Sequence, residues 1–228
     1  MKKLLKIIGL LLLILAVALG IYTYSKNEPI PEGEEGKKAD ELAKKMLKAL
    51  NYDAYKTTRF IEWSFRGKHF YKWDKELDTV SVMWDDKRVS LHTKNPKSSI
   101  VFVKNEKTNA PDILQKAIDY FNNDSFWLVA PYKIFEQGIK RNLVNYKNNK
   151  ALLITYTTGG STPGDSYLWI LDEKGKPVSF KMWVSIIPVG GMEATWNDWI
   201  TCESGVILPS KHDLSISTLD MGNVKGFN

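Results

Sequence analysis

Cysteine and histidine are both scarce in this chain of 228 residues, and their scarcity excludes several kinds of site. Cys202 is the only cysteine, so an intrachain disulfide and a cysteine-rich metal site are excluded. The three histidines, His69, His92 and His212, fall in or beside predicted strands, and none has a second histidine at ligand spacing. We therefore predict no metal and no cofactor, and we expect the histidines to be solvated.

The chain also has little excess charge of either sign. Its formal net charge is +6, but Lys2, Lys3 and Lys6 precede an apolar run and leave only +3 for all other residues. The remaining lysines alternate with acidic residues instead of forming a basic stripe, which is typical of a solvated surface. Nucleic acid is therefore not an expected partner.

Catalytic motifs are lacking as well. The loop from Gly159 to Gly164 has no Gly-Lys-Ser/Thr ending and no following helix, both of which a phosphate-binding loop needs. Pro163 stands where a nucleophile elbow requires its second glycine. The paired carboxylates Asp85–Asp86 and Glu34–Glu35 fall in a predicted turn and a predicted linker, where water solvates them. We predict that no residue is catalytic and that the protein is not an enzyme.

The long hydrophobic run of this chain lies near its N-terminus. The stretch from Ile7 to Tyr24 carries no charge, and as a helix it would span about 27 Å, close to the hydrocarbon core of a bilayer. We predict that residues 1–25 form a membrane anchor, with the preceding lysines in the cytoplasm and the rest of the chain outside. Ala16-Val17-Ala18 fits a cleavage site, so a cleaved signal peptide is the alternative. The anchor residues that we expect to face lipid are Ile7, Leu12, Leu15, Leu19 and Tyr22.

The rest of the chain divides into a linker, residues 26–38, and a single domain, residues 39–228. Prolines, glycines and glutamates dominate this stretch, which shows no hydrophobic periodicity and is therefore interpreted as a linker. From Ala39 to Leu50 apolar residues recur at helical spacing and predict an amphipathic helix. Strands are predicted both before and after a second helix, which starts at Pro111 and is interrupted at residues 122–124. This order predicts an α+β domain with a mainly antiparallel sheet.

Four of the eight tryptophans fall between Tyr167 and Trp199, which reads as a hairpin that turns at residues 172–177. In its second arm apolar residues recur at period two and predict one wholly apolar face. An earlier strand has a similar face. Burial in a core is the usual role of such residues, and the wall of a ligand cavity is the alternative, because two helices are few to cover this sheet. The face in the second arm comprises Val178, Phe180, Met182, Val184 and Ile186, and the earlier face comprises Val80, Val82 and Trp84.

The order of elements, with a late turn and strand at Gly205–Pro209, resembles the superfamily of bacterial lipoprotein carriers and outer-membrane lipoprotein-sorting proteins from Ala39 to Ser217. The resemblance implies a strongly curved half-barrel sheet, with an N-terminal helix and a central helical insertion, that holds acyl chains on its concave side. The N-terminus departs from the carriers and suggests tethering to the inner membrane, with the domain in the periplasm. No functional residue of the carriers matches a position here. The segments around Trp127 and from Gly159 to Trp199 look more like an uncharacterised envelope family of Bacteroidetes-type bacteria, which implies no activity.

We therefore favour a non-enzymatic protein of the cell envelope that binds a lipid or a lipoprotein acyl chain. The second hypothesis is a structural or protein-interaction domain with a filled core. The third is an envelope enzyme that uses Asp165, His212 or Asp213, and the fourth is carbohydrate binding by the tryptophans. The lipid-binding residues that we predict are Val80, Val82, Trp84, Phe180, Met182, Val184 and Ile186.

Overall fold

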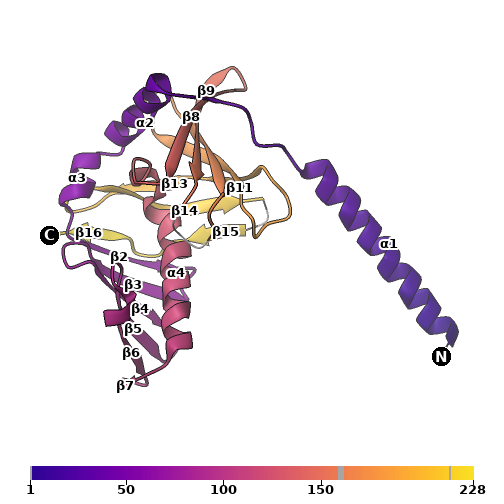
Figure 1. Ribbon diagram of the computed structural model, residues 1–228, viewed down its shortest axis with the longest axis horizontal. Helices are drawn as coiled ribbons and strands as arrows, with labels where there is room; N and C mark the ends of the chain where they lie inside the picture. Colours follow the sequence, from indigo (N-terminus) through magenta and orange to yellow (C-terminus); the bar gives the residue numbers. More distant parts are fainter. Residues whose placement is uncertain (1, 159–161, 216) are drawn as a thin grey trace.

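The computed structural model describes residues 2–158, 162–215 and 217–228. Two antiparallel sheets form the body, and α2 (Lys37–Ala49), α3 (Tyr52–Thr57) and α4 (Pro111–Val129) lie against them. A long helix, α1 (Lys2–Lys26), projects away from this body (Figure 1). The predicted α+β class is therefore confirmed.

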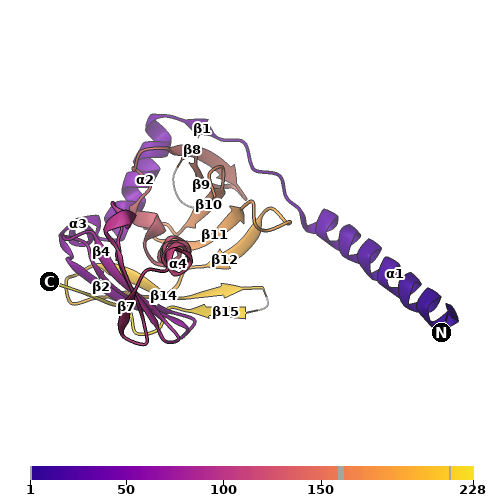
Figure 2. The same ribbon diagram turned by 60° about the horizontal axis from the view of Figure 1, so that its bottom comes forward.

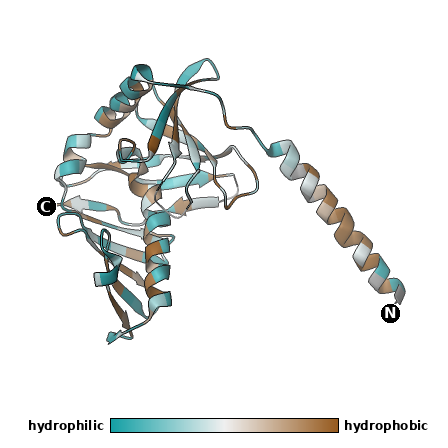
Figure 3. Cartoon of the chain, viewed as in Figure 1, coloured by the Kyte–Doolittle hydropathy of each residue, from teal (hydrophilic) through white to brown (hydrophobic). Residues whose placement is uncertain are grey.

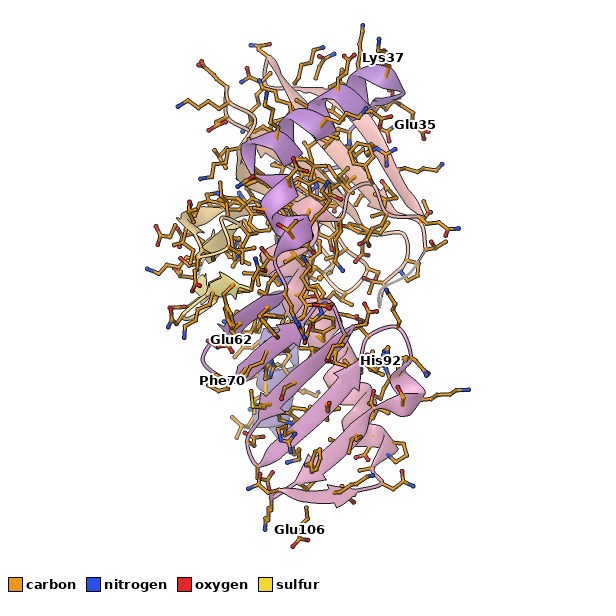
Figure 4. All side chains as sticks on the ribbon, turned by 90° about the vertical axis from the view of Figure 1, so that its left-hand side faces the viewer. Glu35, Lys37, Glu62, Phe70, His92 and Glu106 are labelled. Carbon is orange, nitrogen blue, oxygen red and sulfur yellow. The ribbon has the colours of Figure 1, made fainter. Side chains whose placement is uncertain are left out.

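The smaller sheet, sheet B, is a meander built from local hairpins. Its strand order is β16-β2-β3-β4-β5-β6-β7, so all pairs except the first join neighbours in the sequence. Tight turns suffice for these connections, and in the β4–β5 turn Asp85 adopts the left-handed conformation that such turns require. The strands are β2 (Phe60–Phe65), β3 (His69–Asp74), β4 (Thr79–Trp84), β5 (Lys87–His92), β6 (Ile100–Val103), β7 (Glu106–Thr108) and β16 (Lys225–Phe227), with a short helix η1 (Pro96–Ser98) before β6. Figure 4 views this sheet, with Phe70 of β3 and His92 of β5 labelled on it.

The larger sheet, sheet A, has the order β1-β8-β9-β10-β11-β12-β14-β13, and β15 pairs with β14. The predicted hairpin is β10 and β11, in which Trp169 lies opposite Phe180. β11 ends earlier than the period-two pattern suggests, because the Ser185 N–H donates to Asp165 Oδ1 (2.9 Å) and not to a neighbouring strand. The strands are β1 (Glu34–Glu35), β8 (Ile139–Tyr146), β9 (Asn149–Tyr156), β10 (Ser166–Leu171), β11 (Pro177–Trp183), β12 (Met192–Thr195), β13 (Asn197–Thr201), β14 (Ile207–Leu214) and β15 (Ser217–Asp220).

The strands thus form two sheets, where the resemblance led us to expect one. The two sheets meet along a seam made by the C-terminal segment, in which β15 pairs with β14 and β16 pairs with β2. Between these two pairings, the backbone N–H groups of Ser64 and Arg66 donate to Met221 O (3.0 Å) and Asp220 O (2.8 Å). The last twelve residues therefore hold the sheets together through backbone hydrogen bonds, which depend little on side-chain identity.

Helix α4 lies between the two sheets and forms the centre of the core (Figure 2). Its first half packs on β4, β5 and β6, and its second half reaches β14. Phe121 packs edge-on against Trp73 of sheet B, with 5.4 Å between ring centroids. Six residues later, Trp127 packs on Phe180 of sheet A at 5.6 Å. One helix thus buries apolar surface from both sheets at once. A small number of helices is therefore enough to cover the apolar faces of the sheets.

The interruption that we predicted at residues 122–124 is wrong, because α4 continues through it to Val129. Asn and Asp favour helix breaks when their side chains bond to nearby backbone. Here the Asp124 side chain is buried and engages sheet B instead, since the Tyr71 hydroxyl donates to Asp124 Oδ2 (2.5 Å) and His69 Nδ1 lies 2.7 Å from the same oxygen. Tertiary partners therefore decide the conformation at this position.

Part of the predicted linker lies against the other face of sheet A, and we call residues 27–35 the strap. Glu28 forms an ion pair with Lys181 (2.5 Å), and Trp183 Nε1 donates to Glu28 O (2.7 Å). Further along, β1 pairs with β8 and leads into α2, at the end of the body opposite Glu106 (Figure 4). The strap lies on the face that carries a small buried cluster of Val144, Ala151, Leu153 and Leu168.

Candidate functional site

A cleft of about 380 Å³ opens beside the C-terminal half of α4, where that helix approaches the ends of β9, β10 and β11. This volume falls at the lower end of the range of small-molecule sites, about 300–1,000 Å³. Lys133, Glu136 and Gln137 supply polar groups from the segment that follows α4. The apolar lining includes Phe126, Tyr156, Tyr167, Met182, Val184 and Ile187. An apolar wall next to a polar edge suits an amphiphilic ligand.

Three aromatic rings from three elements pack together in this lining. Phe126 of α4 lies 4.4 Å from the ring of Tyr167 and 6.3 Å from that of Tyr156, measured between centroids. The two tyrosine rings meet edge-on at 5.7 Å. Burial raises the pKa of both phenols above the ordinary value of 10, so both hydroxyls stay neutral at physiological pH. The cleft therefore presents aromatic surface and two neutral hydroxyls.

Asp165 also borders the cleft, but its carboxylate is occupied. Thr162 Oγ1 donates to Asp165 Oδ2, and the Ser185 N–H donates to Asp165 Oδ1 at 2.9 Å. The side chain thus ties the loop before β10 to the loop after β11. Both oxygens already accept hydrogen bonds from the protein, so the arrangement is that of a structural clamp between two loops.

The other two residues of the enzyme hypothesis have partners elsewhere. His212 is fully buried, and its Nδ1 lies 2.8 Å from Thr195 O. Asp213 is exposed on the opposite side of β14, where the Thr218 hydroxyl donates to it at 2.7 Å. The side chains of Asp165, His212 and Asp213 have different hydrogen-bond partners, so the three do not form a shared hydrogen-bonded constellation among the described residues.

Our expectation that the histidines are solvated is wrong for His212 and His69. Burial lowers the pKa of His212 from 6.5 to about 4, so the ring stays neutral and can pack against Trp196 at 4.6 Å between centroids. His69 packs against Tyr120 at 3.8 Å while its Nδ1 faces the buried Asp124. In both cases a hydrogen bond at Nδ1 offsets part of the free-energy cost of removing the ring from water.

The predicted lipid-binding residues separate into three groups in the structure. Met182, Val184 and Ile186 line the cleft. Phe180 lies beneath it, with no exposed surface, among the rings of Phe126, Trp127 and Trp169. Val80, Val82 and Trp84 are buried in sheet B, where α4 packs on β4. Val178, which the period-two pattern placed on the same face, is exposed.

Most of the cleft lining was not predicted from the sequence, including the aromatic residues Phe126, Tyr156 and Tyr167. The unusually apolar run from Ser125 to Glu136 was a usable signal for Phe126, but we interpreted this run as a mixed loop and helical turn around Pro131. Within the described residues, no group of three His, Cys, Asp or Glu side chains is placed to hold a metal ion.

Helix α1 takes no part in the core. Residues Lys6–Lys26 are long and apolar enough to cross a membrane, spanning about 32 Å as a helix. Figure 3 shows hydrophobic residues along most of its length. The side chains of Ile7, Leu12 and Leu15 are exposed, as expected of residues that face lipid, whereas those of Leu19 and Tyr22 lie outside the described set. A signal sequence has the same character.

No protein-family model and no curated protein matches this chain. Among solved structures it is similar to a domain from Vibrio parahaemolyticus that bears the name of an outer membrane lipoprotein-sorting protein. The two chains share 7% identity with a TM-score of 0.38, over 81% of this chain and 93% of the other.

Proposed function

We propose that the protein is a non-enzymatic component of the cell envelope that holds a lipid or lipoprotein acyl chain in the cleft beside α4. The observation that carries this proposal is the combination of an apolar, aromatic wall with the polar edge formed by Lys133, Glu136 and Gln137. An acyl chain would lie against Phe126, Tyr167 and Met182. Its headgroup would stay at the polar edge, where water and the lysine remain accessible.

The strength of binding depends on where the acyl chain comes from. Moving about six methylenes from water into the cleft would contribute about 5 kcal/mol. Moving them from a bilayer contributes little, because the chain leaves one apolar environment for another. The cleft would therefore exchange lipid reversibly with a membrane and protect an acyl chain that has left one.

The location that we propose follows from α1. Lys2, Lys3 and Lys6 precede the apolar stretch, so the positive-inside rule keeps them in the cytoplasm. The domain then lies on the periplasmic side of the inner membrane, tethered through α1, or free in the periplasm if cleavage follows Ala18.

Photocrosslinking in a membrane tests the acyl site directly. The full chain would be reconstituted in nanodiscs that contain a fatty acid with a diazirine near its methyl end, and crosslinked peptides would be identified by mass spectrometry. We expect crosslinks in α1 from the surrounding bilayer, and additional crosslinks at Phe126, Tyr167 or Met182. Crosslinks confined to α1 would exclude an acyl chain in the cleft.

A matched pair of variants shows whether the cleft itself is responsible. Val184→Trp adds a large ring to the lining and should abolish the cleft crosslinks while leaving those in α1. Val178→Trp places the same ring on an exposed position of β11 outside the cleft. It should change neither the cleft crosslinks nor those in α1.

A filled structural core is the second candidate function, because Phe180, Val80 and Val82 have no exposed surface beyond 1%. A structural or protein-interaction domain would give no crosslinks in the body with either variant. It would also bind no lipid when purified in the absence of detergent.

A further inference from the structure

The chain between the membrane helix and the body is too short to let the body move away from the bilayer. Helix α1 ends at Lys26, and two residues later the Glu28 N–H donates to Gly190 O at 3.0 Å. The Gly190 N–H donates in turn to Asn27 Oδ1 at 2.8 Å. Two residues span at most about 7 Å, so Gly190 lies next to the end of α1. The ion pair of Glu28 with Lys181 attaches the start of the strap to β11 as well.

The two glycines at this contact are required by its closeness. A Cβ on Gly190 would lie 2.5 Å from Trp183 Cδ1 and 2.9 Å from Glu28 O. Gly191 has a φ of +80°, and a Cβ there would lie 2.7 Å from the Cβ of Glu28. Side chains at either position would push the strap away from the sheet. The loop and the strap are thus shaped for each other.

The loop that makes this contact, residues 184–191, also forms one side of the cleft. Its sequence, Val-Ser-Ile-Ile-Pro-Val-Gly-Gly, has no charged residue in a chain in which 25% of residues are charged. Val184, Ile186 and Ile187 line the cleft, and Ile186 is 74% exposed. In Figures 1 and 2 this loop, which follows β11, reaches toward the connection to α1.

The end of α1 that adjoins this loop carries the residues of a membrane interface. Tyr24 is exposed in the last turn and Lys26 ends the helix, a pairing found where spanning helices leave the hydrocarbon region. The bilayer surface therefore lies at the level of Tyr24, a few residues from the loop. An exposed isoleucine without neighbouring charges favours that surface over water.

We propose that the loop 184–191 docks into the outer surface of the membrane that α1 crosses, so that the cleft opens directly onto this bilayer. The occupant of the exposed apolar surface at Ile186 is the lipid of that membrane. The docking rests on the location proposed above, in which α1 stays in the membrane, but it does not depend on what the cleft holds. A lipid would enter sideways between Val184 and Ile187 without crossing water, and the protein would act on its own membrane and not as a shuttle.

Spin-label depth measurements test the docking on the full chain. The variant Ile186→Cys in a Cys202→Ala background would carry a nitroxide, in nanodiscs of phosphatidylethanolamine and phosphatidylglycerol. The matched control is Leu77→Cys, a leucine that is 58% exposed in the β3–β4 turn, where the neighbouring Lys75 bonds to α3 on the side of the body away from α1. We expect the ratio of oxygen to nickel-chelate collisions to be severalfold higher at position 186 than at position 77.

The outcomes separate the docking from lipid binding. Equal collision ratios at the two positions would overturn the docking, even if cleft crosslinks to the diazirine fatty acid persist. A deep label at position 186, together with no cleft crosslinks when the cleft lining is unchanged, would support docking and overturn the acyl site. A deep label that persists with Val184→Trp would show that docking does not depend on a lipid in the cleft. The intact mass of the purified chain provides a further check, because a chain that begins after Ala18 would lack the tether and overturn the proposal.

Discussion

His212 should make the stability of this protein depend on pH in the weakly acidic range. Its ring is fully buried, with Nδ1 at 2.8 Å from Thr195 O and the rings of Trp127 and Trp196 at 5.3 and 4.6 Å. Nε2 has no hydrogen-bond partner of good geometry among the described residues. Protonation would therefore place a charge and a second N–H donor in apolar surroundings.

The sign and size of the effect follow from the pKa. Burial lowers the pKa of His212 from 6.5 to about 4, so between these values the unfolded chain binds a proton that the folded protein does not. The free energy of unfolding must then fall as the pH falls through this window. At about 1.4 kcal/mol per pKa unit, lowering the pH from 8 to 5 removes about 2 kcal/mol from this single group.

Urea unfolding of the full chain in detergent micelles, followed by tryptophan fluorescence at pH 8, 7, 6 and 5, measures the slope. In His212→Gln the amide can still donate to Thr195 O but cannot titrate, so about 2 kcal/mol of pH dependence should disappear. His92→Gln is the control, since His92 lies at the end of β5 and is only half-buried. All other titratable groups are present in both the parent protein and His212→Gln, so their contributions cancel when the pH dependence of the two proteins is subtracted. An unchanged slope in His212→Gln would refute the reasoning.

Three further predictions concern the core, the buried carboxylate and the strap. Phe180→Ala should lower the free energy of unfolding by about 3–5 kcal/mol because the ring is fully buried, whereas Ile186→Ser at the cleft mouth should change it by less than about 0.5 kcal/mol in urea titrations. Asp124→Ala should lower the free energy of unfolding by about 1–3 kcal/mol, because it leaves buried donors without an acceptor. Asp119→Ala, at an exposed position of the same helix, should leave that free energy nearly unchanged, and equal losses in the two variants would contradict the role of the buried carboxylate. Gly190→Ala should loosen the strap and speed hydrogen exchange of residues 27–35 without unfolding α2, and unchanged exchange would show that the close contact is not needed.

Much of the element order was predictable because each element carries its own local signal. The amphipathic helix at Ala39–Leu50 appears as α2, and the polar turn at residues 172–177 joins β10 to β11. The break at residues 122–124 failed as a prediction because Asp124 is bonded by Tyr71 and His69, which are more than fifty residues away. The period-two face of β11 was right at Phe180 and Met182 but wrong at Val178, which is exposed.

The sequence by itself determined the long apolar helix near the N-terminus and the α+β class, since hydrophobic length and periodicity are properties of contiguous residues. Only the tertiary structure decided that α4 fills most of the space between the sheets and leaves a cleft at one end, where Phe126 meets Tyr156 and Tyr167. It also decided that the loop after β11 lies next to the end of α1, where the strap begins. These features join residues that are distant in the chain, and no local pattern records which distant surfaces will pack against each other.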